Sequence, residues 1–195
     1  MDSSSGEPSS RIFHHTGFRA YVTAQTCSSL SFQIISLAVS WQLYSMTHSA
    51  FMLGMIGLMQ FVPSVLLALP AGHLADQYNR KSLILGGQSV ELLAALGLIL
   101  MSFLMPGSAV LLLSLVFIFS LARAFEGPSM TSLLPALLPA GLLSKGMATN
   151  QVFREAMVIA GPMAGGLLYV VSPALAYETA AVCYLISLLV MMRLK

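Results

Sequence analysis

The sequence predicts an all-α polytopic membrane protein with six transmembrane helices. Of its 195 residues, 57% are hydrophobic and only 8% are charged, and the mean hydropathy is +0.84. These values lie outside the usual range of soluble globular domains. Glycine, proline and charged residues divide the chain into six apolar runs, each close to the roughly 20 residues that a helix needs to cross a bilayer.

The six helices are expected near residues 20–44, 49–71, 82–105, 109–131, 147–170 and 174–194. The breaks at Met105-Pro106-Gly107 and Ser172-Pro173 end apolar runs because proline cannot continue a hydrogen-bonded helix. Two prolines within residues 133–141 predict an interfacial loop between the fourth and fifth helices. Residues 1–17 are polar and rich in serine, which predicts a disordered tail and leaves residues 18–195 for the bundle.

Basic residues gather on one side of the expected helices. The loops near 45–48, 106–108 and 171–173 carry no lysine or arginine, whereas the opposite side carries Arg11, Arg19, Arg80, Lys81, Lys145, Arg193 and Lys195. By the positive-inside rule, both termini and the tail are cytoplasmic, and an even number of helices is favoured. The net charge of +2 is spread over short loops, which predicts contact with the lipid bilayer and no nucleic-acid partner.

A polar stripe runs along the first expected helix. Its members follow one another at helical spacing and so share one face: Gln25, Ser29, Gln33, Ser36 and Ser40. Unsatisfied polar groups are costly in hydrocarbon, so this face must meet protein or water. Two interpretations stay open: the stripe lines a substrate cavity, or it is a helix contact joined by hydrogen bonds.

Among the charged residues inside the expected helices, we single out Arg123, Glu126 and Glu91. An arginine within a span is costly unless it is paired, and Glu126 lies three residues after Arg123, near enough to be its partner. Alternatively, Arg123 snorkels to the headgroups from the end of its helix. Glu91 lies deep in the third helix. It is either a proton-titrating carboxylate or a structural partner for a polar group of a neighbouring helix.

A short charged segment follows the second helix and reads Gly72-His73-Leu74-Ala75-Asp76-Gln77-Tyr78-Asn79-Arg80-Lys81. It resembles the loop signature of major facilitator superfamily transporters, whose glycine, aspartate and final basic pair correspond to Gly72, Asp76, Arg80 and Lys81. Asp76 is expected to cap a helix or pair with a basic residue. Gln77 replaces the usual arginine, and Asn79 replaces a glycine whose left-handed backbone asparagine tolerates. The resemblance implies a gating loop that latches the cytoplasmic side.

Two further motifs support the resemblance. Arg123 and the residues up to Gly127 are similar to the fourth-helix motif, whose arginine is linked to proton coupling; Glu126 and Glu91 are candidate coupling residues beside it. The fifth helix resembles that of exporters and contains Gly161, Pro162, Gly165 and Gly166. Small residues four apart allow close helix approach and proline permits bending, which suits a gate. Generic packing is the alternative.

The resemblance covers nearly residues 18–194 and implies one bundle with a three-plus-three inverted repeat, of the drug and siderophore efflux branch. It implies alternating-access export of a small molecule, driven by protons, across the bacterial inner membrane. The chain is then a half-length or truncated carrier that needs a second six-helix half or another copy of itself. A non-transporting scaffold or accessory protein, and a homo-oligomeric small channel or carrier, remain alternatives.

Enzymatic chemistry is not expected. None of the four histidines stands at metal-ligand spacing from a cysteine or acid, and the chain shows neither a phosphate-binding glycine loop nor a serine elbow. The sequence therefore predicts no metal, no cofactor and no catalytic residue.

Overall fold

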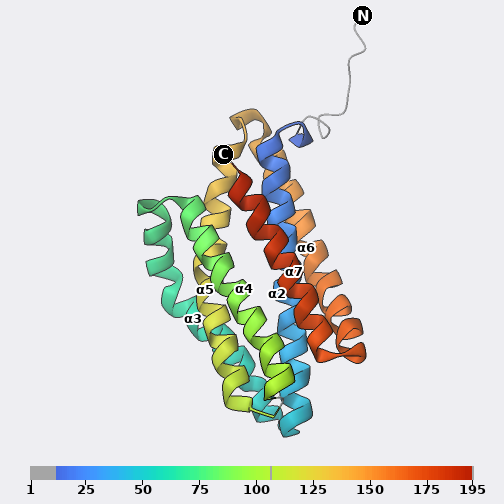
Figure 1. Cartoon of the computed structure of the whole chain (residues 1–195). Coiled ribbons are helices and arrows are strands. Elements are labelled where there is room, and N and C mark those ends of the chain that lie inside the picture. Colours follow the sequence, from blue (N-terminus) through green and yellow to red (C-terminus); the bar gives the residue numbers. More distant parts are fainter. Residues whose placement is uncertain (1–11, 106, 195) are drawn as a thin grey trace, which may run out of the picture.

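The computed structural model describes residues 12–105 and 107–194, and this part of the chain is helical with no strand. Six of its helices are long and apolar enough to cross a membrane. They are α2 (Thr16–Thr47), α3 (Ala50–Gln77), α4 (Arg80–Leu104), α5 (Ala109–Leu137), α6 (Ala140–Val171) and α7 (Pro173–Arg193). Figure 1 shows them as a bundle in which the start of α2 and the end of α7 lie at the same end, called the terminus end below. The predicted fold class is confirmed.

Several helices extend further than the sequence predicts, and α5 shows why. It continues through Pro128 and Pro135 to Leu137, so the loop expected over 133–141 is wrong and only Leu138 and Pro139 connect α5 to α6. A helix in a membrane tolerates proline when neighbouring groups satisfy the freed backbone. Here the guanidinium of Arg80 donates to the carbonyl of Ser132 at 2.8 Å, one turn before Pro135.

The expected charged loop is mostly helix. Residues Gly72 to Gln77 complete α3 and Arg80 opens α4, so only Tyr78 and Asn79 lie between them. Asn79 has φ −61° and ψ 112°, and its side chain accepts from the backbone N–H of Lys81 at 3.0 Å. The left-handed turn expected at Asn79 is therefore wrong, because this residue is the N-cap of α4.

The segment expected as a tail overlaps the described structure only in part. Residues 1–11 lie outside the described residues, whereas Thr16 already begins α2. Ile12 is buried and packs in the apolar core at the terminus end. The bundle thus includes residues just before its first helix.

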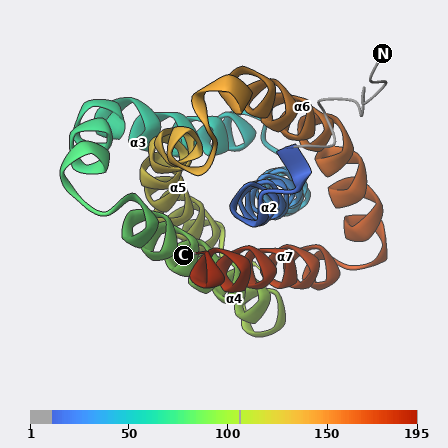
Figure 2. The same ribbon diagram turned by 90° about the horizontal axis from the view of Figure 1, so that it is seen from above.

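Seen from above in Figure 2, α2 lies toward the middle of the bundle. α2 packs closely on α6 and α7, just as α5 packs closely on α3 and α4. α2 runs away from the terminus end, and α5 runs back toward it. The set α5 to α7 therefore repeats the set α2 to α4 with the opposite direction, and the first helix of each set packs on the last two helices of the other. This pattern is that of a three-plus-three inverted repeat.

Two apolar clusters fill the interior and enclose a polar layer between them. One cluster, from Ile34 to Tyr184, lies toward the far end, and the other, from Ile12 to Leu194, lies at the terminus end. The buried polar residues between them come from four helices: Ser28 of α2, Gln88 and Glu91 of α4, Glu126 of α5 and Ser187 of α7. The bundle interior is therefore apolar at both ends and charged in the middle.

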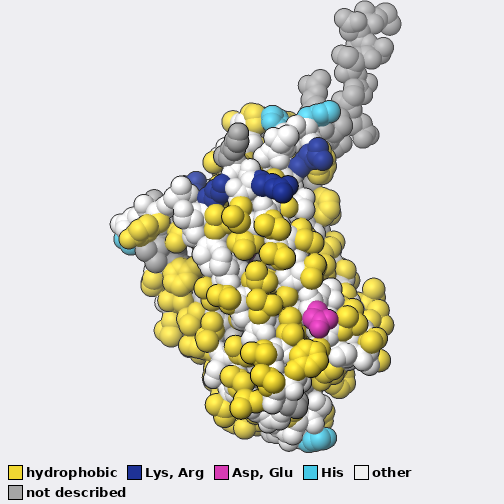
Figure 3. Space-filling model, viewed as in Figure 1, with side chains coloured by type: hydrophobic (Ala, Val, Ile, Leu, Met, Phe, Trp, Pro, Cys, Tyr) yellow, Lys and Arg dark blue, Asp and Glu magenta, His cyan; other side chains and the backbone are white. Residues whose placement is uncertain are grey.

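The outer surface is suited to lipid. Figure 3 shows apolar side chains over most of one face and basic side chains near the terminus end. Large apolar residues are widely exposed on it, with Val170 85% and Ile159 77% accessible. Exposed apolar surface of this extent is expected where lipid, not water, surrounds the helices.

Close contact between α2 and α6 depends on two glycines. A Cβ at Gly161 would clash with the Cβ of Gln33, and a Cβ at Gly165 would lie 3.1 Å from the backbone of Ile34. Both glycines are buried, in a helix with only one other buried residue among those described. They therefore set how near α6 approaches α2.

We expect Gly161→Ala to lower the free energy of unfolding by about 1–3 kcal/mol, because the added methyl group overpacks the α2 contact. Reversible unfolding in mixed micelles measures this change. The matched control is Gly86→Ala in α4, where a Cβ would meet nothing within 4 Å. Equal stability of the two variants would contradict the close contact.

Candidate functional site

Three charged side chains meet inside the bundle and are called the charge cluster: Glu91 of α4 with Arg123 and Glu126 of α5. Arg123 forms an ion pair with Glu126 one turn later on the same helix. Its Nη1 also lies 4.0 Å from Glu91 Oε1. The two glutamates are 0% and 1% exposed. A buried charge in a span is costly without a partner, and the cluster supplies one.

Glu126 connects four helices through hydrogen bonds. Ser28 Oγ of α2 and Gln88 Nε2 of α4 each donate to Glu126 Oε1 at 2.8 Å. Gln88 Nε2 also donates to Ser187 Oγ of α7 at 2.9 Å, and Ser187 Oγ donates to the carbonyl of Ala24 at 2.8 Å. This network satisfies the carboxylate and ties α2, α4 and α7 to α5.

Arg123 lies between the buried network and a more open region. Its Nη1 donates to Ser28 Oγ at 2.7 Å, and its guanidinium lies 4.9 Å from the ring centre of Phe32, a cation–π distance. The side chain keeps 23% of its surface exposed. Arg123 is therefore the member of the charge cluster that a solute can reach.

Glu91 is the least satisfied member of the cluster. Neither of its carboxyl oxygens has a hydrogen-bond partner among the described residues, and the same holds for the hydroxyl of Tyr184. Its nearest charge is Arg123, which already serves Glu126. The cluster thus has two carboxyl groups for one guanidinium.

The pairing of Arg123 with Glu126 agrees with the prediction, whereas the snorkelling alternative does not describe this side chain. α5 continues to Leu137, so Arg123 is far from the helix end, and its guanidinium points at Glu126 and Ser28. The prediction missed Ser28, Gln88 and Ser187. Gln88 could have been found, since it stands three residues before Glu91 on one helical face.

A polar pocket of about 410 Å³, called the inner pocket, opens beside Arg123 in the half nearer the terminus end. Arg154 and Asn150 of α6 lie across it from α5. Its lining comes from α2, α3, α5 and α6, and the polar members are Tyr21, Gln25, Ser64, Arg123, Thr131, Asn150 and Arg154. Its size is within the range of small-molecule sites.

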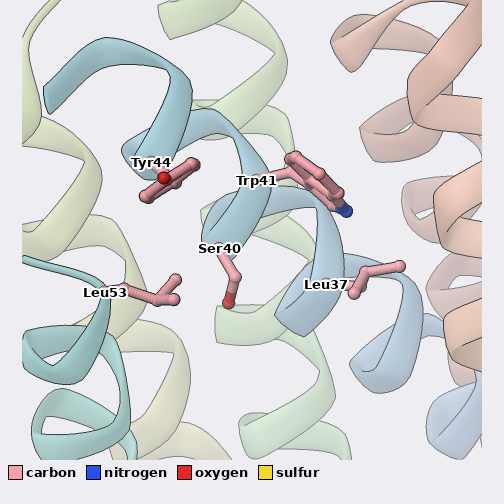
Figure 4. A pocket seen from close by; sticks show the side chains of 5 residues that line it. All are labelled: Leu37, Ser40, Trp41, Tyr44 and Leu53. Carbon is pink, nitrogen blue, oxygen red and sulfur yellow. The ribbon is translucent and has the colours of Figure 1, made fainter. Parts of the chain in front are cut away.

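A second pocket of about 320 Å³, called the outer pocket, lies toward the opposite end between α2 and α3. Figure 4 shows its lining side chains: Leu37, Ser40, Trp41, Tyr44 and Leu53. Trp41 and Tyr44 are 52% and 42% exposed. The outer pocket is apolar and aromatic, unlike the inner pocket.

The polar stripe of α2 lines pockets at some positions and contacts other helices at others. Gln25 lines the inner pocket and Ser40 lines the outer pocket. Between them, Ser36 accepts from Gln60 Nε2 of α3 at 3.1 Å, and Gln33 packs on Gly161 of α6. Ser29 is buried and accepts from Gln25 at 3.2 Å. The stripe therefore includes both pocket lining and helix contact.

The basic residues of the charged segment contact helix ends of the same bundle. Arg80 holds the carbonyl of Ser132 in α5. Lys81 Nζ donates to the carbonyl of Met192 at 3.0 Å and also to that of Leu194, at the end of α7. Gly72 has open space around it, and the pairing expected of Asp76 lies outside what the structure describes. The segment thus joins α4 to α5 and α7.

Gly161 and Gly165 pack on α2, Gly166 approaches Leu37 of α2, and Pro162 lies inside α6.

Among the described residues, no group of three histidine, cysteine or acidic side chains is placed to hold a metal ion. The arrangement is therefore a buried ionic core with a pocket on either side along α2.

Comparison with known proteins adds a family. The major facilitator family described as "transmembrane secretion effector" matches residues 9–195. Macrolide efflux protein A of Streptococcus pyogenes is 28% identical over 145 residues, which cover 74% of this chain and 36% of that protein. The enterobactin exporter EntS of Shigella boydii is 32% identical over 158 residues, covering 79% and 37%. The chain thus spans well under half the length of these relatives.

We expect Arg123→Gln to lower the free energy of unfolding by about 3–5 kcal/mol, because it leaves two buried carboxyl groups without their cation. Unfolding in mixed micelles measures the loss. The double variant Arg123→Gln/Glu126→Gln removes one of those carboxylates and should be more stable than the sum of the single changes, by about 0.5–3 kcal/mol.

The matched control is Arg193→Gln, which removes an exposed arginine from the last turn of α7 and should change stability by less than about 0.5 kcal/mol. Additive effects of the Arg123 and Glu126 substitutions would show that the two side chains are not coupled.

Proposed function

Because the chain belongs to the transmembrane secretion effector family of the major facilitator superfamily, we propose that it forms one bundle of an efflux transporter for small molecules. It is a multi-pass membrane protein of a transporter family, not an enzyme. The observation that carries the proposal is the polar stripe of α2, which runs from the inner pocket at Gln25 to the outer pocket at Ser40. These residues are about 22 Å apart along the helix.

The open side of α2 supports this role. α3 and α6 make at most a marginal contact with each other, and both pockets use α2 together with one or both of these helices. A polar face that is not closed by its own bundle needs water, substrate or further protein. A second six-helix bundle, whether in the same polypeptide, a separate chain or another copy, would complete the pathway.

The charge cluster is suited to proton coupling. Two carboxyl groups and one guanidinium balance to zero net charge only when one carboxyl group is protonated, and an unbalanced charge is costly at this depth. Glu91 has no hydrogen-bond partner among the described residues and is the candidate proton carrier. Arg123, which faces Glu91 and lines the inner pocket, would transmit the charge state of Glu91 to that pocket. Glu126 would hold Arg123 in place.

The remaining motifs are assigned to the conformational change. α6 would act as a gate. Its movement would depend on the two glycines of the tight α2 contact, Gly161 and Gly165, and on the neighbouring Pro162 and Gly166. The charged segment would form a latch that closes the terminus end. It contains Gly72 and Asp76, and its Arg80 and Lys81 are hydrogen-bonded to α5 and to the end of α7. Alternating access in this superfamily requires such reversible closure.

We expect both termini to be cytoplasmic, in the inner membrane of a bacterium, because the described basic residues near helix ends lie toward the terminus end. Green fluorescent protein fused after Lys195 should fluoresce, and alkaline phosphatase fused after Gly107 should be active. The reciprocal fusions are the controls. Fluorescence after Gly107 with phosphatase activity after Lys195 would reverse the assigned orientation.

We expect this chain, co-expressed with the second bundle of a relative such as macrolide efflux protein A, to lower dye accumulation in bacteria that lack their own pumps. A protonophore should abolish the effect. Glu91→Gln should remove its dependence on the proton gradient, because the amide cannot exchange a proton. Glu178→Gln is the control, since Glu178 is an exposed acid of α7 outside the charge cluster. The measurement is dye accumulation against external pH.

Unchanged accumulation of every dye with both bundles present would reject the transport proposal and favour a scaffold. Efflux by this chain alone would favour a homo-oligomeric carrier. Proton-dependent efflux that survives Glu91→Gln would overturn the coupling role of Glu91 while leaving transport in place.

A further inference from the structure

We propose that the inner pocket binds the anionic group of an exported amphiphile, with Arg154 as the residue that recognises the charge. The inference rests on the proposed transport function and names a substrate class for it. Arginine is suited to this task because its planar guanidinium donates to carboxylate, sulfonate or phosphate oxygens in two directions at once.

The first argument is the charge on the pocket wall. Arg123 and Arg154 line it from α5 and α6, and among the described residues that line it none is acidic. Glu126 and Glu91 lie behind Arg123, buried in the helix core. Glu155, the neighbour of Arg154, is exposed and accepts from Gln151 at 2.6 Å. The described lining of the pocket thus presents guanidinium groups and no carboxylate to a solute.

The second argument separates the roles of the two arginines. Arg123 is engaged by Glu126, Ser28 and Phe32. Arg154 makes neither an ion pair nor a hydrogen bond with any residue that the structure describes, and it is exposed. An arginine in the middle of a membrane helix without a partner is costly. An anionic ligand in the pocket would supply that partner.

The third argument is an unused polar group beside Arg154. The side-chain amide oxygen Oδ1 of Asn150, one turn before Arg154 on α6, is buried without a hydrogen-bond partner among the described residues. Rotation of its amide would direct the N–H₂ group into the pocket instead. Gln25 also lines the pocket, and its amide has a second N–H besides the one that it donates to Ser29. Together with the guanidinium, these groups can satisfy the several lone pairs of an oxyanion.

The shape of the site defines the rest of the ligand. The lining includes Ala68, Ala124 and Pro128 beside the polar groups, so an apolar body can lie against the wall. The volume of about 410 Å³ is enough for an aromatic acid or the head of a larger amphiphile. The substrate class is therefore an amphipathic organic anion.

The test compares 1-naphthoate with the neutral 1-naphthamide, which has nearly the same shape, by calorimetric titration of the purified chain in nanodiscs of phosphatidylcholine. We expect naphthoate to bind about tenfold or more tightly than naphthamide, as for one charge-assisted hydrogen bond. Arg154→Gln should remove this preference and Arg154→Lys should keep part of it. Lys145→Gln, an exposed cation of α6 outside the pocket lining, should leave it unchanged.

Equal affinity for the two ligands, or a preference that survives Arg154→Gln, overturns the proposal. Elution and thermal unfolding of each variant establish that it is folded. Repeating the titration with phosphatidylglycerol in the nanodisc separates the two sources of an anion. Binding of naphthoate that persists assigns the pocket to a solute, and loss of binding assigns it to a lipid headgroup and overturns the export role.

The experiment also separates this inference from the transport function. Titration needs no second bundle and no flux, so selective binding without efflux would leave the anion site standing and reject transport. Efflux by a protein that binds the anion and the neutral ligand equally would reject the anion site and leave the transport function standing.

Discussion

The buried ion pair between Arg123 and Glu126 is the interaction on which the rest of the bundle depends. A charge in the middle of a membrane protein must find its partners inside the protein, because lipid offers none. Glu126 finds them on three other helices through Ser28, Gln88 and, by way of Gln88, Ser187. The helix order and rotation that bring these groups together are therefore strongly constrained. Apolar packing alone would accept many other arrangements.

The apolar parts of the bundle follow from this polar centre. The two apolar clusters close the core above and below it, and they keep water away from the network. The repeated packing of α2 on α6 and of α5 on α3 places the two sets of three helices on either side of the same centre. Single residues then act locally: Gly161 allows the close approach of α6 to α2, and Arg80 ties α4 to the Ser132 carbonyl of α5.

α2 combines two environments that the function requires. Its buried side carries Ser28 to the ion pair, and its open side carries Gln25 and Ser40 to the two pockets. Arg123 connects these sides, since it pairs with Glu126 inside and lines the inner pocket outside. In the proposed mechanism, a change of charge in the core is therefore felt directly where a substrate would bind.

The sequence by itself determined the six spans and offered Glu126 as one of two possible partners for Arg123, the other being the headgroups. Hydropathy over some 20 residues and a spacing of three along a helix are local properties, so no knowledge of the other helices is needed. Only the tertiary structure decided that Glu91 faces Arg123. It also decided that Arg154 and Asn150 share a pocket with Arg123, and which carbonyl groups of α5 and α7 accept from Arg80 and Lys81. These contacts depend on how each helix is rotated about its own axis, which packing against its neighbours sets. The loops expected over 72–81 and 133–141 are mostly helix in the structure, because hydrogen bonding along a helix can continue past the polar residues and prolines that predict a turn.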